Sequence, residues 1–378
     1  MIARHERVHP CADGRLIAIS DIHGHLPLFD KLLGRIALAP RDTLIVVGDM
    51  CERGNESLGM IRRAMELRAR GNAHFMMGNV DINSLSAATG KGHFTCAQSL
   101  SFLRRMFEGC GCTLFHEMCA ELGMDAGKAL EDEAELARAQ QEICGAFRSE
   151  LEFMASLPTF ITAGQYAFVH GGAPSCGFDR YAGMDAWPFL KRDAFIDSGT
   201  VMDRYTIVGH WPAALYRSHG MSNAPYIERR QRIIDIDGGV GIRKMAQLNA
   251  LILPAQGEDF SWLSVDECRR YRALDAQQCR PDTIYIRWGH CDVDVISEQG
   301  DTALVRHIES GRILPVPACM LYDREPGCAR CHCGDISDGE IEVRPGDELG
   351  VAAITSRGAI AKRGDDIGWY MGRIEPVD

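Results

Sequence analysis

The sequence has no uninterrupted apolar run of the length that a membrane helix needs. One stretch, residues 153–178, contains no Asp, Glu, Lys or Arg across 26 positions, but two prolines, several glycines and a histidine interrupt it. Buried core with turns explains this composition better than a bilayer span. The first ten residues carry several charges and have no apolar centre, so we expect no signal peptide.

Basic residues are too few for an extended nucleic-acid surface. Lys and Arg number 41 against 52 Asp and Glu, which gives a net charge of −11. Binding along a phosphate backbone needs clustered positive charge, so this class of function is excluded, whereas a local phosphate site is not. With 378 residues, 46% of them hydrophobic and 25% charged, the chain is long enough for two soluble domains.

A disulfide framework is not expected either. The 15 cysteines are odd in number, and without a secretion signal they indicate free thiols in a cytoplasmic protein. One group contains the Cys-x-x-Cys spacing of structural zinc sites and comprises Cys319, Cys328, Cys331 and Cys333. Its other spacings are irregular, so zinc ligation and free thiols both stay open.

Short aliphatic runs alternate with helical patterns over the first 90 residues. Residues 16–19 and 44–47 are strand-like, and apolar residues at helical spacing follow each of them. This alternation predicts β–α–β units with strands buried on both faces. Strand patterns return at residues 166–169, 206–208 and 232–236. We therefore expect an α/β domain over residues 1–255.

Residues 83–155 break the rhythm and predict a helical insertion. Between Glu117 and Glu152 the insertion holds 10 acidic and 3 basic residues, which fits a solvated helix face or a cap over a site. From residue 276 short strands and glycine turns predict a small all-β, barrel-like domain over 276–378. The polar segment 256–278 shows no clear strand pattern and is taken as the boundary.

Polar residues follow the predicted strands of the first domain directly. The candidate metal ligands come from five strand ends and are Asp21, His23, Asp49, Asn79, His170 and His210. Carboxyl ends of parallel strands share one edge of a sheet, where such folds place ligand sites. Two divalent ions bridged by a carboxylate could clamp a phosphate there, and Asp49 is the expected bridge. Carboxylate, imidazole and amide ligands suit Mn, Fe, Zn or Ni.

The order and spacing of these elements resemble the calcineurin-like metallophosphoesterases. Within them the match is to the PPP-type serine/threonine phosphatases and their bacterial relatives. The matching segments are Ser20-Asp21-Ile22-His23-Gly24, Gly48-Asp49 with Arg53-Gly54, Gly78-Asn79, His170-Gly171-Gly172 and Gly209-His210. The resemblance covers residues 14–252 and implies a metallophosphoesterase β-sandwich flanked by helices.

The resemblance also implies roles for single residues. Asp21, His23 and Asp49 would hold one metal, and Asp49 would share the second with Asn79, His170 and His210. Arg53 would grip a phosphate oxygen through its planar fork. Arg192 lies where the bacterial phosphatases have a second phosphate-contacting arginine, although this match is looser.

Three residues depart from the family pattern. Ser20 replaces the first glycine of the first motif, which should be tolerated if the backbone there needs no positive φ. Val80 stands where the family has a histidine that protonates the leaving alkoxide, and Glu52 replaces the aspartate that orients that histidine. Loss of a general acid typically lowers the rate by about 10²–10⁴ for poor leaving groups. His25 or His93 could take over the role, or could be ordinary structural histidines.

The sequence therefore predicts a dinuclear-metal phosphoesterase. We expect hydrolysis of phosphomonoesters, including phosphorylated serine, threonine or tyrosine in proteins, by a hydroxide shared between the ions. The alternatives are a phosphodiesterase or nucleotide hydrolase, and a non-catalytic binding module. The C-terminal domain would recruit a partner. Manganese is the metal that we expect to support activity in assays.

Overall fold

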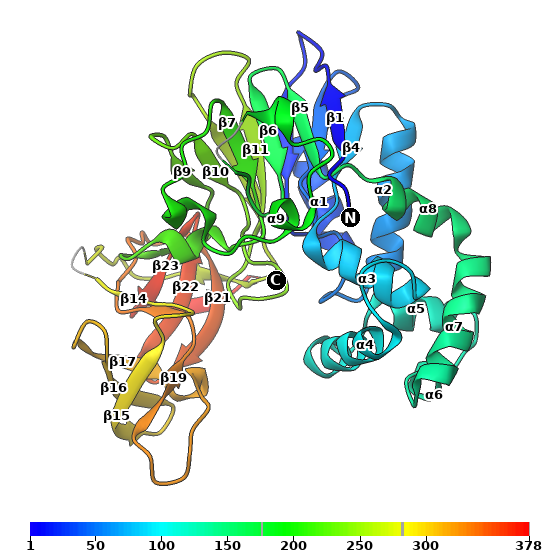
Figure 1. Cartoon of the computed structure of the whole chain (residues 1–378). Coiled ribbons are helices and arrows are strands. Elements are labelled where there is room, and N and C mark those ends of the chain that lie inside the picture. Colours follow the sequence, from blue (N-terminus) through cyan, green and yellow to red (C-terminus); the bar gives the residue numbers. More distant parts are fainter. Residues whose placement is uncertain (175–176, 281–282, 378) are drawn as a thin grey trace. The chain divides into compact units, whose positions relative to one another are not determined.

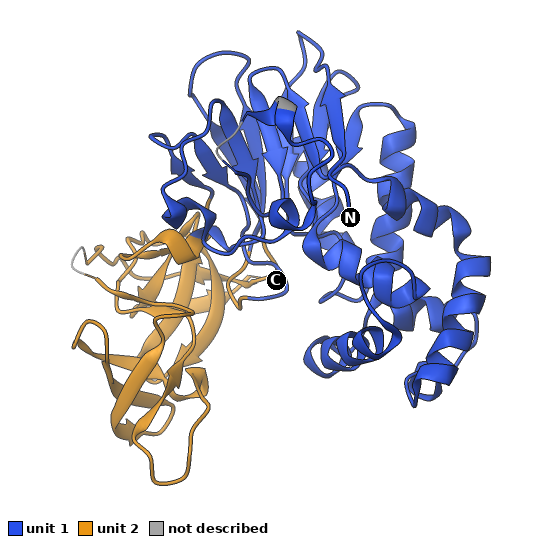
Figure 2. Ribbon diagram, viewed as in Figure 1, with its two compact units in different colours: residues 1–213, 225–242, 247–265 blue, residues 214–224, 243–246, 266–378 orange. Residues whose placement is uncertain are grey.

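The computed structural model describes residues 1–174, 177–280 and 283–377, and these divide into two compact units (Figure 2). Unit 1 comprises residues 1–213, 225–242 and 247–265. Unit 2 comprises residues 214–224, 243–246 and 266–378. Unit 2 thus takes two short segments from the part of the sequence that precedes the expected boundary.

Unit 1 is built around two sheets (Figure 1). The first sheet runs in the order β1 (His5–Val8), β5 (Phe160–Ala163), β6 (Tyr166–Val169), β7 (Tyr205–Val208), β10 (Ile233–Asp235), β9 (Tyr226–Glu228). The second runs in the order β12 (Ser261–Val265), β11 (Leu248–Leu253), β2 (Leu16–Ile19), β3 (Thr43–Val46), β4 (Ala73–Phe75).

The core of unit 1 lies between these sheets. Ala18 and Ile45 from one sheet share an apolar cluster with Phe168 and Ile207 from the other. β2, β3 and β4 are parallel to one another, and β6 is parallel to β7. Their carboxyl ends therefore lie together at one edge within each sheet, which is the geometry that the candidate ligands require.

Helices connect and cover the strands. They are α1 (Leu26–Ile36), α2 (Ser57–Ala69), α3 (Asn79–Thr89), α4 (Cys96–Cys110), α5 (Leu114–Glu121), α6 (Ala126–Ala129), α7 (Glu133–Ala146), α8 (Arg148–Ser156) and α9 (Trp187–Leu190). Short 3₁₀ turns occupy Phe178–Arg180, Phe195–Ser198, Ala213–Tyr216 and Ala318–Met320. Figure 1 shows α3 to α8 gathered on one side of the sandwich as the expected helical insertion. No helix in the described part of the chain is long and apolar enough to cross a membrane.

The insertion is fastened to the start of α2 by one carboxylate. The amides of Ser57 and Leu58 donate to the two carboxylate oxygens of Glu117 at 2.7 and 2.8 Å. Amides in the first turn of a helix have no partner within the helix, and a negative charge there is stabilising. Glu117 of α5 thus caps the N-terminus of α2, which begins three residues after Gly54.

Unit 2 is all β. Its larger sheet runs in the order β24 (Ile374–Pro376), β13 (Arg269–Ala273), β21 (Glu348–Thr355), β22 (Gly358–Arg363), β23 (Asp366–Tyr370), β8 (Met221–Ser222). A second sheet runs in the order β17 (Ile313–Pro317), β16 (Thr302–His307), β15 (Asp292–Gln299), β19 (Arg330–Cys333), β18 (Leu321–Tyr322), and β14 (Tyr285–Ile286) pairs with β20 (Ile336–Ser337). Bulges in β15 and β21 curl the sheets, as in a barrel.

The absence of strands from the boundary segment 256–278 was a wrong expectation. The segment contains β12 and β13, which pair with β11 and β21. Arg269, Arg270 and Arg272 dilute the apolar pattern of β13, because only Tyr271 and Ala273 of this strand are buried. Pairing with distant strands decides the conformation here, and a local pattern does not report such pairing.

Candidate metal centre

Five strand ends deliver the six candidate ligands to one place in unit 1. Asp21 and His23 follow β2, Asp49 follows β3, and Asn79 follows β4 as the first residue of α3. His170 directly follows β6, and His210 follows β7.

The ligand atoms form two groups that share Asp49. One atom each from Asp21, His23 and Asp49 lie within 4.8 Å of one another, as do one atom each from Asp49, His170 and His210. Asn79 joins the second group, because its Oδ1 lies 3.1 Å from Nε2 of His170. One carboxylate between two ligand groups is the arrangement that a dinuclear centre requires.

Backbone carbonyls fix two of the imidazoles. Nδ1 of His23 donates to the carbonyl of Cys51 at 3.1 Å, and Nδ1 of His170 donates to that of Val47 at 2.8 Å. Because a carbonyl oxygen only accepts, Nδ1 of each ring carries a proton, and Nε2 is the nitrogen available to a metal. Nε2 of His170 lies 3.3 Å from Asp49, and Nε2 of His23 lies 3.9 Å from both Asp21 and Asp49.

The loops that carry the ligands have strained backbones. Ten non-glycine residues of the described chain have positive φ, and six of them are in these loops: Asp21, His23, Asp49, Glu52, Arg53 and His210, at 50–71°. Such conformations are uncommon for residues with a Cβ and cluster at functional sites. Sharp turns right after the strands bring side chains from separate loops together.

Two glycines of the motifs allow this crowding. A Cβ on Gly78 would collide with the carboxylate of Asp49, and a Cβ on Gly209 would collide with that of Asp21. The glycines that precede Asn79 and His210 are therefore required by close packing against the ligands.

Burial perturbs every ionisable group of the cluster. Burial lowers the pKa of His23 to about 4. Burial and the charge of His170 together lower the pKa of His210 to about 4. Burial also acts to lower the pKa of His170, but Asp49 and Asp21 outweigh it and raise the pKa to about 10. Burial and the neighbouring Asp237 raise the pKa of Asp21 well above its usual range. Buried carboxylates at this density are unfavourable without a cation.

The donor set therefore fits two divalent cations. Oxygen and nitrogen atoms are already grouped, two imidazoles favour the neutral ligand form, and a buried carboxylate lacks a compensating charge. Mn, Fe, Zn and Ni all accept this mixture of ligands.

Arg53 and Arg192 have different surroundings. A Cβ on Gly241 would lie 2.8 Å from Cβ of Arg53 and 3.3 Å from Cε1 of His25, so these two side chains flank the same glycine. Nε of Arg53 is buried without a hydrogen-bond partner among the described residues. Arg192 instead donates to the carbonyl of Ala173 at 3.0 Å and lies over the ring of Phe195.

Val80 and Glu52, which depart from the family pattern, are both buried but contact different partners. Val80 is buried, and its amide donates to Asp49 at 2.8 Å. Glu52 is fully buried and accepts from the Ser84 hydroxyl at 2.6 Å and the Leu114 amide at 3.4 Å, so it faces the helical insertion. Both ring nitrogens of His93 are already hydrogen-bonded, to Ser86 and Asn83.

Two site residues were missed at the level of sequence. Asp81 accepts the amides of Met50, Cys51 and Gly78 at 2.9–3.1 Å and so ties the Asp49 loop to the Asn79 loop. Asp193 accepts from Nε2 of His210 at 2.8 Å, which leaves Nδ1 of His210 for a metal. The position of Asp81 directly after Gly78-Asn79-Val80 was a signal for its role in the sequence. Nothing in the sequence indicated the role of Asp193.

A comparison with known families decides the identity of this architecture. The family model of the calcineurin-like phosphoesterases matches residues 14–226, more than half of the chain. The chain belongs to this family. Members of this family use divalent metal ions.

Curated relatives of this calcineurin-like phosphoesterase match over a shorter segment. The symmetrical bis(5'-nucleosyl)-tetraphosphatases of Acidovorax ebreus and Delftia acidovorans are 38% and 40% identical over 76 residues. That segment is 20% of this chain, and it spans about a quarter (26%) of the length of each relative.

Solved structures are similar at lower identity. A serine/threonine phosphatase of Saccharomyces cerevisiae is 14% identical, with a TM-score of 0.41 over 70% of this chain and 84% of its own. A cold-active protein-tyrosine phosphatase of a Shewanella species is 15% identical, with a TM-score of 0.35 over 67% of this chain and 79% of its own.

Loss of the Asp193 carboxylate is expected to weaken metal binding. Carboxylates that orient ligating histidines contribute about 10–100-fold to metal affinity, so Asp193→Ala should raise the dissociation constant of one of two metal ions by that factor. Calorimetric titration with Mn measures it. Asp197→Ala, an exposed neighbour on the same segment, is the control, and an equal effect in both variants would contradict the orienting role.

Glu52 is expected to make stability fall as pH rises. Burial raises its pKa to about 7, against hydrogen bonds from Ser84 and Leu114 that lower it. With an unfolded value near 4.5, the folded state holds the proton more tightly, so the contribution of Glu52 to stability is full below pH 4.5 and is lost as pH rises through 7. The loss is up to about 3 kcal/mol. Thermal unfolding between pH 5 and 8 should show it, and Glu52→Gln should flatten the profile. A slope that persists in the variant would assign it to another group.

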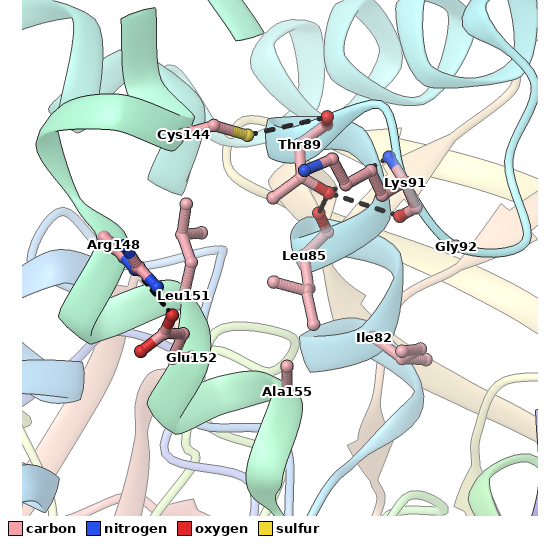
Figure 3. A pocket seen from close by; sticks show the side chains of 10 residues that line it. All are labelled: Ile82, Leu85, Thr89, Lys91, Gly92, Cys144, Arg148, Leu151, Glu152 and Ala155. Atoms are coloured by element: carbon pink, nitrogen blue, oxygen red, sulfur yellow. Dashed lines mark hydrogen bonds and ion pairs between the residues drawn. The ribbon is translucent and has the colours of Figure 1, made fainter. Parts of the chain in front are cut away.

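A separate pocket lies between α3 and α8 and has a cavity volume of about 590 Å³ (Figure 3). Its lining is mostly apolar and comprises Ile82, Leu85, Thr89, Lys91, Gly92, Cys144, Arg148, Leu151, Glu152 and Ala155. Arg148 and Glu152 pair across one turn of α8. None of the candidate metal ligands lines it, so it is not part of the metal centre.

The cysteines considered for zinc do not gather. Among the described residues, no three ligand atoms that include Cys319, Cys328, Cys331 or Cys333 lie within 4.8 Å of one another. Cys331 and Cys333 are buried in β19, whereas Cys319 and Cys328 are exposed. The geometry adds no support to a zinc site here.

Proposed function

We propose that unit 1 hydrolyses phosphomonoesters at a centre of two divalent cations. The observation that carries the proposal is the position of Asp49, whose carboxylate belongs to both groups of ligand atoms. Asp21 and His23 would hold one ion, and Asn79, His170 and His210 the other. Two such ions supply an activated water and polarise a bound phosphate.

The side chains around the ions have defined tasks. Arg53 holds a phosphate oxygen, since its buried Nε has no partner among the described residues and a guanidinium matches phosphate geometry. The carbonyls of Cys51 and Val47 hold the rings of His23 and His170 in the ligating tautomer. Asp193 does the same for His210. Arg192 is a weaker candidate for a phosphate contact, because Ala173 and Phe195 already engage it.

The leaving group sets the preferred substrate. Val80 has no proton to give, and Glu52 faces the helical insertion. A phenol with a pKa near 10 leaves without a proton donor far more readily than an aliphatic alcohol. Aryl phosphates, including phosphorylated tyrosine, are therefore preferred over phosphorylated serine or threonine.

Hydrolysis of a phosphoanhydride is the second candidate. A nucleotide is a weakly basic leaving group and, like a phenol, needs no proton from the position of Val80. The similarity to symmetrical bis(5'-nucleosyl)-tetraphosphatases over 76 residues favours this alternative, although the similarity spans a quarter of those proteins.

Parallel assays with added Mn test the proposal. The substrates are p-nitrophenyl phosphate, bis(p-nitrophenyl) phosphate, glycerol 2-phosphate and diadenosine tetraphosphate. We expect kcat/KM for the aryl monoester to be higher than that for the diester. It should exceed kcat/KM for glycerol 2-phosphate by about 10²-fold or more. A diester preference of about a hundredfold would overturn the proposal, and a preference for the tetraphosphate would establish the second candidate.

A further inference from the structure

Aromatic rings at the junction of α3 and α9 form a partly exposed row. The ring of His93 lies 4.4 Å from that of Phe94 and 5.5 Å from that of Trp187, and Phe94 lies 5.5 Å from Phe102. His93 is exposed, and 38% of the surface of Trp187 is accessible. Single exposed apolar residues need no explanation, but these rings contact one another in sequence.

His93, inside the row, is fixed to α3, the helix that begins with Asn79. Nε2 of His93 lies 2.9 Å from Oδ1 of Asn83, and its Nδ1 lies 3.1 Å from Oγ of Ser86. Asn83 is four residues after Asn79, a separation of roughly 6 Å along the helix axis. The imidazole is thus held beside α3, the helix that carries Asn79 as its first residue.

One end of the row belongs to the segment that packs against the histidine ligands. Trp187 begins α9, and the carbonyl of Phe189 accepts the amide of Gly171 at 2.7 Å, directly after His170. The same segment continues to Asp193, which hydrogen-bonds His210. Contact between His93 and Trp187 therefore spans the two elements that flank the second group of ligands.

We propose that His93 and Trp187 form a stacking face for a planar aromatic ring on the phosphorylated substrate. The inference rests on the proposed function and specifies its substrate class, in which Arg53 holds the phosphate and the ring pair holds the aromatic group. The contact between the two rings joins the elements that flank the second group of ligands, and both rings keep exposed surface. His93 contributes its ring face rather than a proton, because Asn83 and Ser86 engage both nitrogens.

Equilibrium binding distinguishes recognition of the aromatic ring from recognition of the phosphate group. A phosphonate analogue of adenosine 5'-monophosphate, whose P–C bond is not hydrolysed, and inorganic phosphate are titrated calorimetrically against the protein with Mn, wild type and Trp187→Leu. Stacking on an aromatic side chain changes base affinity by about 5- to 100-fold, so we expect the dissociation constant of the nucleotide to rise about tenfold. That of inorganic phosphate should stay unchanged, and Trp187→Phe should restore nucleotide affinity.

Phe107→Leu is the matched control, because Phe107 is 44% exposed and stacks on His116 in the helical insertion at 4.4 Å. It should leave both ligands unaffected. The KM of p-nitrophenyl phosphate in the same variants distinguishes a phenyl ring from a nucleobase as the occupant. Two results for Trp187→Leu would overturn the stacking face. One is an unchanged dissociation constant for the nucleotide together with an unchanged KM for p-nitrophenyl phosphate. The other is an equal loss of affinity for inorganic phosphate. Failure of the wild type to hydrolyse any substrate would refute the proposed function alone, since binding is measured without turnover.

Discussion

Asp49→Asn is expected to abolish phosphoester hydrolysis, with a loss of at least about 10³-fold, and to release both metal ions. Asp49 is the carboxylate common to both groups of ligand atoms, and an amide cannot supply negative charge to two cations. Asparagine tolerates the positive φ of 50° at this position, so the backbone should persist. Elemental analysis together with the rate on p-nitrophenyl phosphate measures both effects.

Asp13→Asn is the control for this substitution, because Asp13 is an exposed aspartate on the same unit. It should keep two equivalents of metal and full activity. If Asp49→Asn retained both metal ions and the wild-type rate, the dinuclear centre would have to be placed elsewhere in the chain.

Arg53→Lys should lower kcat/KM by about 10²–10³-fold while leaving the metal content unchanged. An ammonium is a point charge and cannot reproduce the planar fork of a guanidinium on phosphate. The buried Nε of Arg53, without a partner among the described residues, marks the donor that would be lost. Steady-state kinetics with p-nitrophenyl phosphate and thermal unfolding of the same preparation distinguish this effect from misfolding.

Arg192→Lys provides the comparison. Since Ala173 and Phe195 already engage Arg192, we expect a smaller loss of activity than in Arg53→Lys. An equal or larger loss would give Arg192 the main contact with phosphate, and wild-type kinetics in Arg53→Lys would remove Arg53 from the site.

Local sequence patterns predicted the strands that lie inside the sandwich. Residues 16–19 and 166–169 form β2 and β6 with the expected bounds, because strands buried on both faces are apolar throughout. Strands at the edge or in unit 2 are harder to predict. β13 carries three arginines and is a strand because β21 and β24 pair with it on either side, which is information outside its own residues.

The candidate ligands were predictable for a related reason. Each lies within four residues of the end of an apolar strand, so the position of the strand end largely fixes the position of the side chain. Trp187 belongs instead to the short helix α9, and Asp193 follows that helix; the course of this part of the chain depends on contacts with Gly171 and His210. Asp81 was visible in the sequence, but its three amide partners come from two other loops, so its role required the folded chain.

The carboxylate of Glu117 has a consequence for protein engineering. Because it caps α2 from a helix 60 positions away along the chain, trimming the helical insertion would leave two amides at the start of α2 exposed to solvent or unsatisfied. That start lies just beyond Arg53 and Gly54. Glu56 already precedes Ser57 but makes no side-chain cap, so a shortened variant would need a shorter N-cap acceptor, such as aspartate in place of Glu56, to keep the loop of Arg53 in place. The acidic insertion is thus part of the scaffold that supports the edge of the sandwich where the candidate ligands lie.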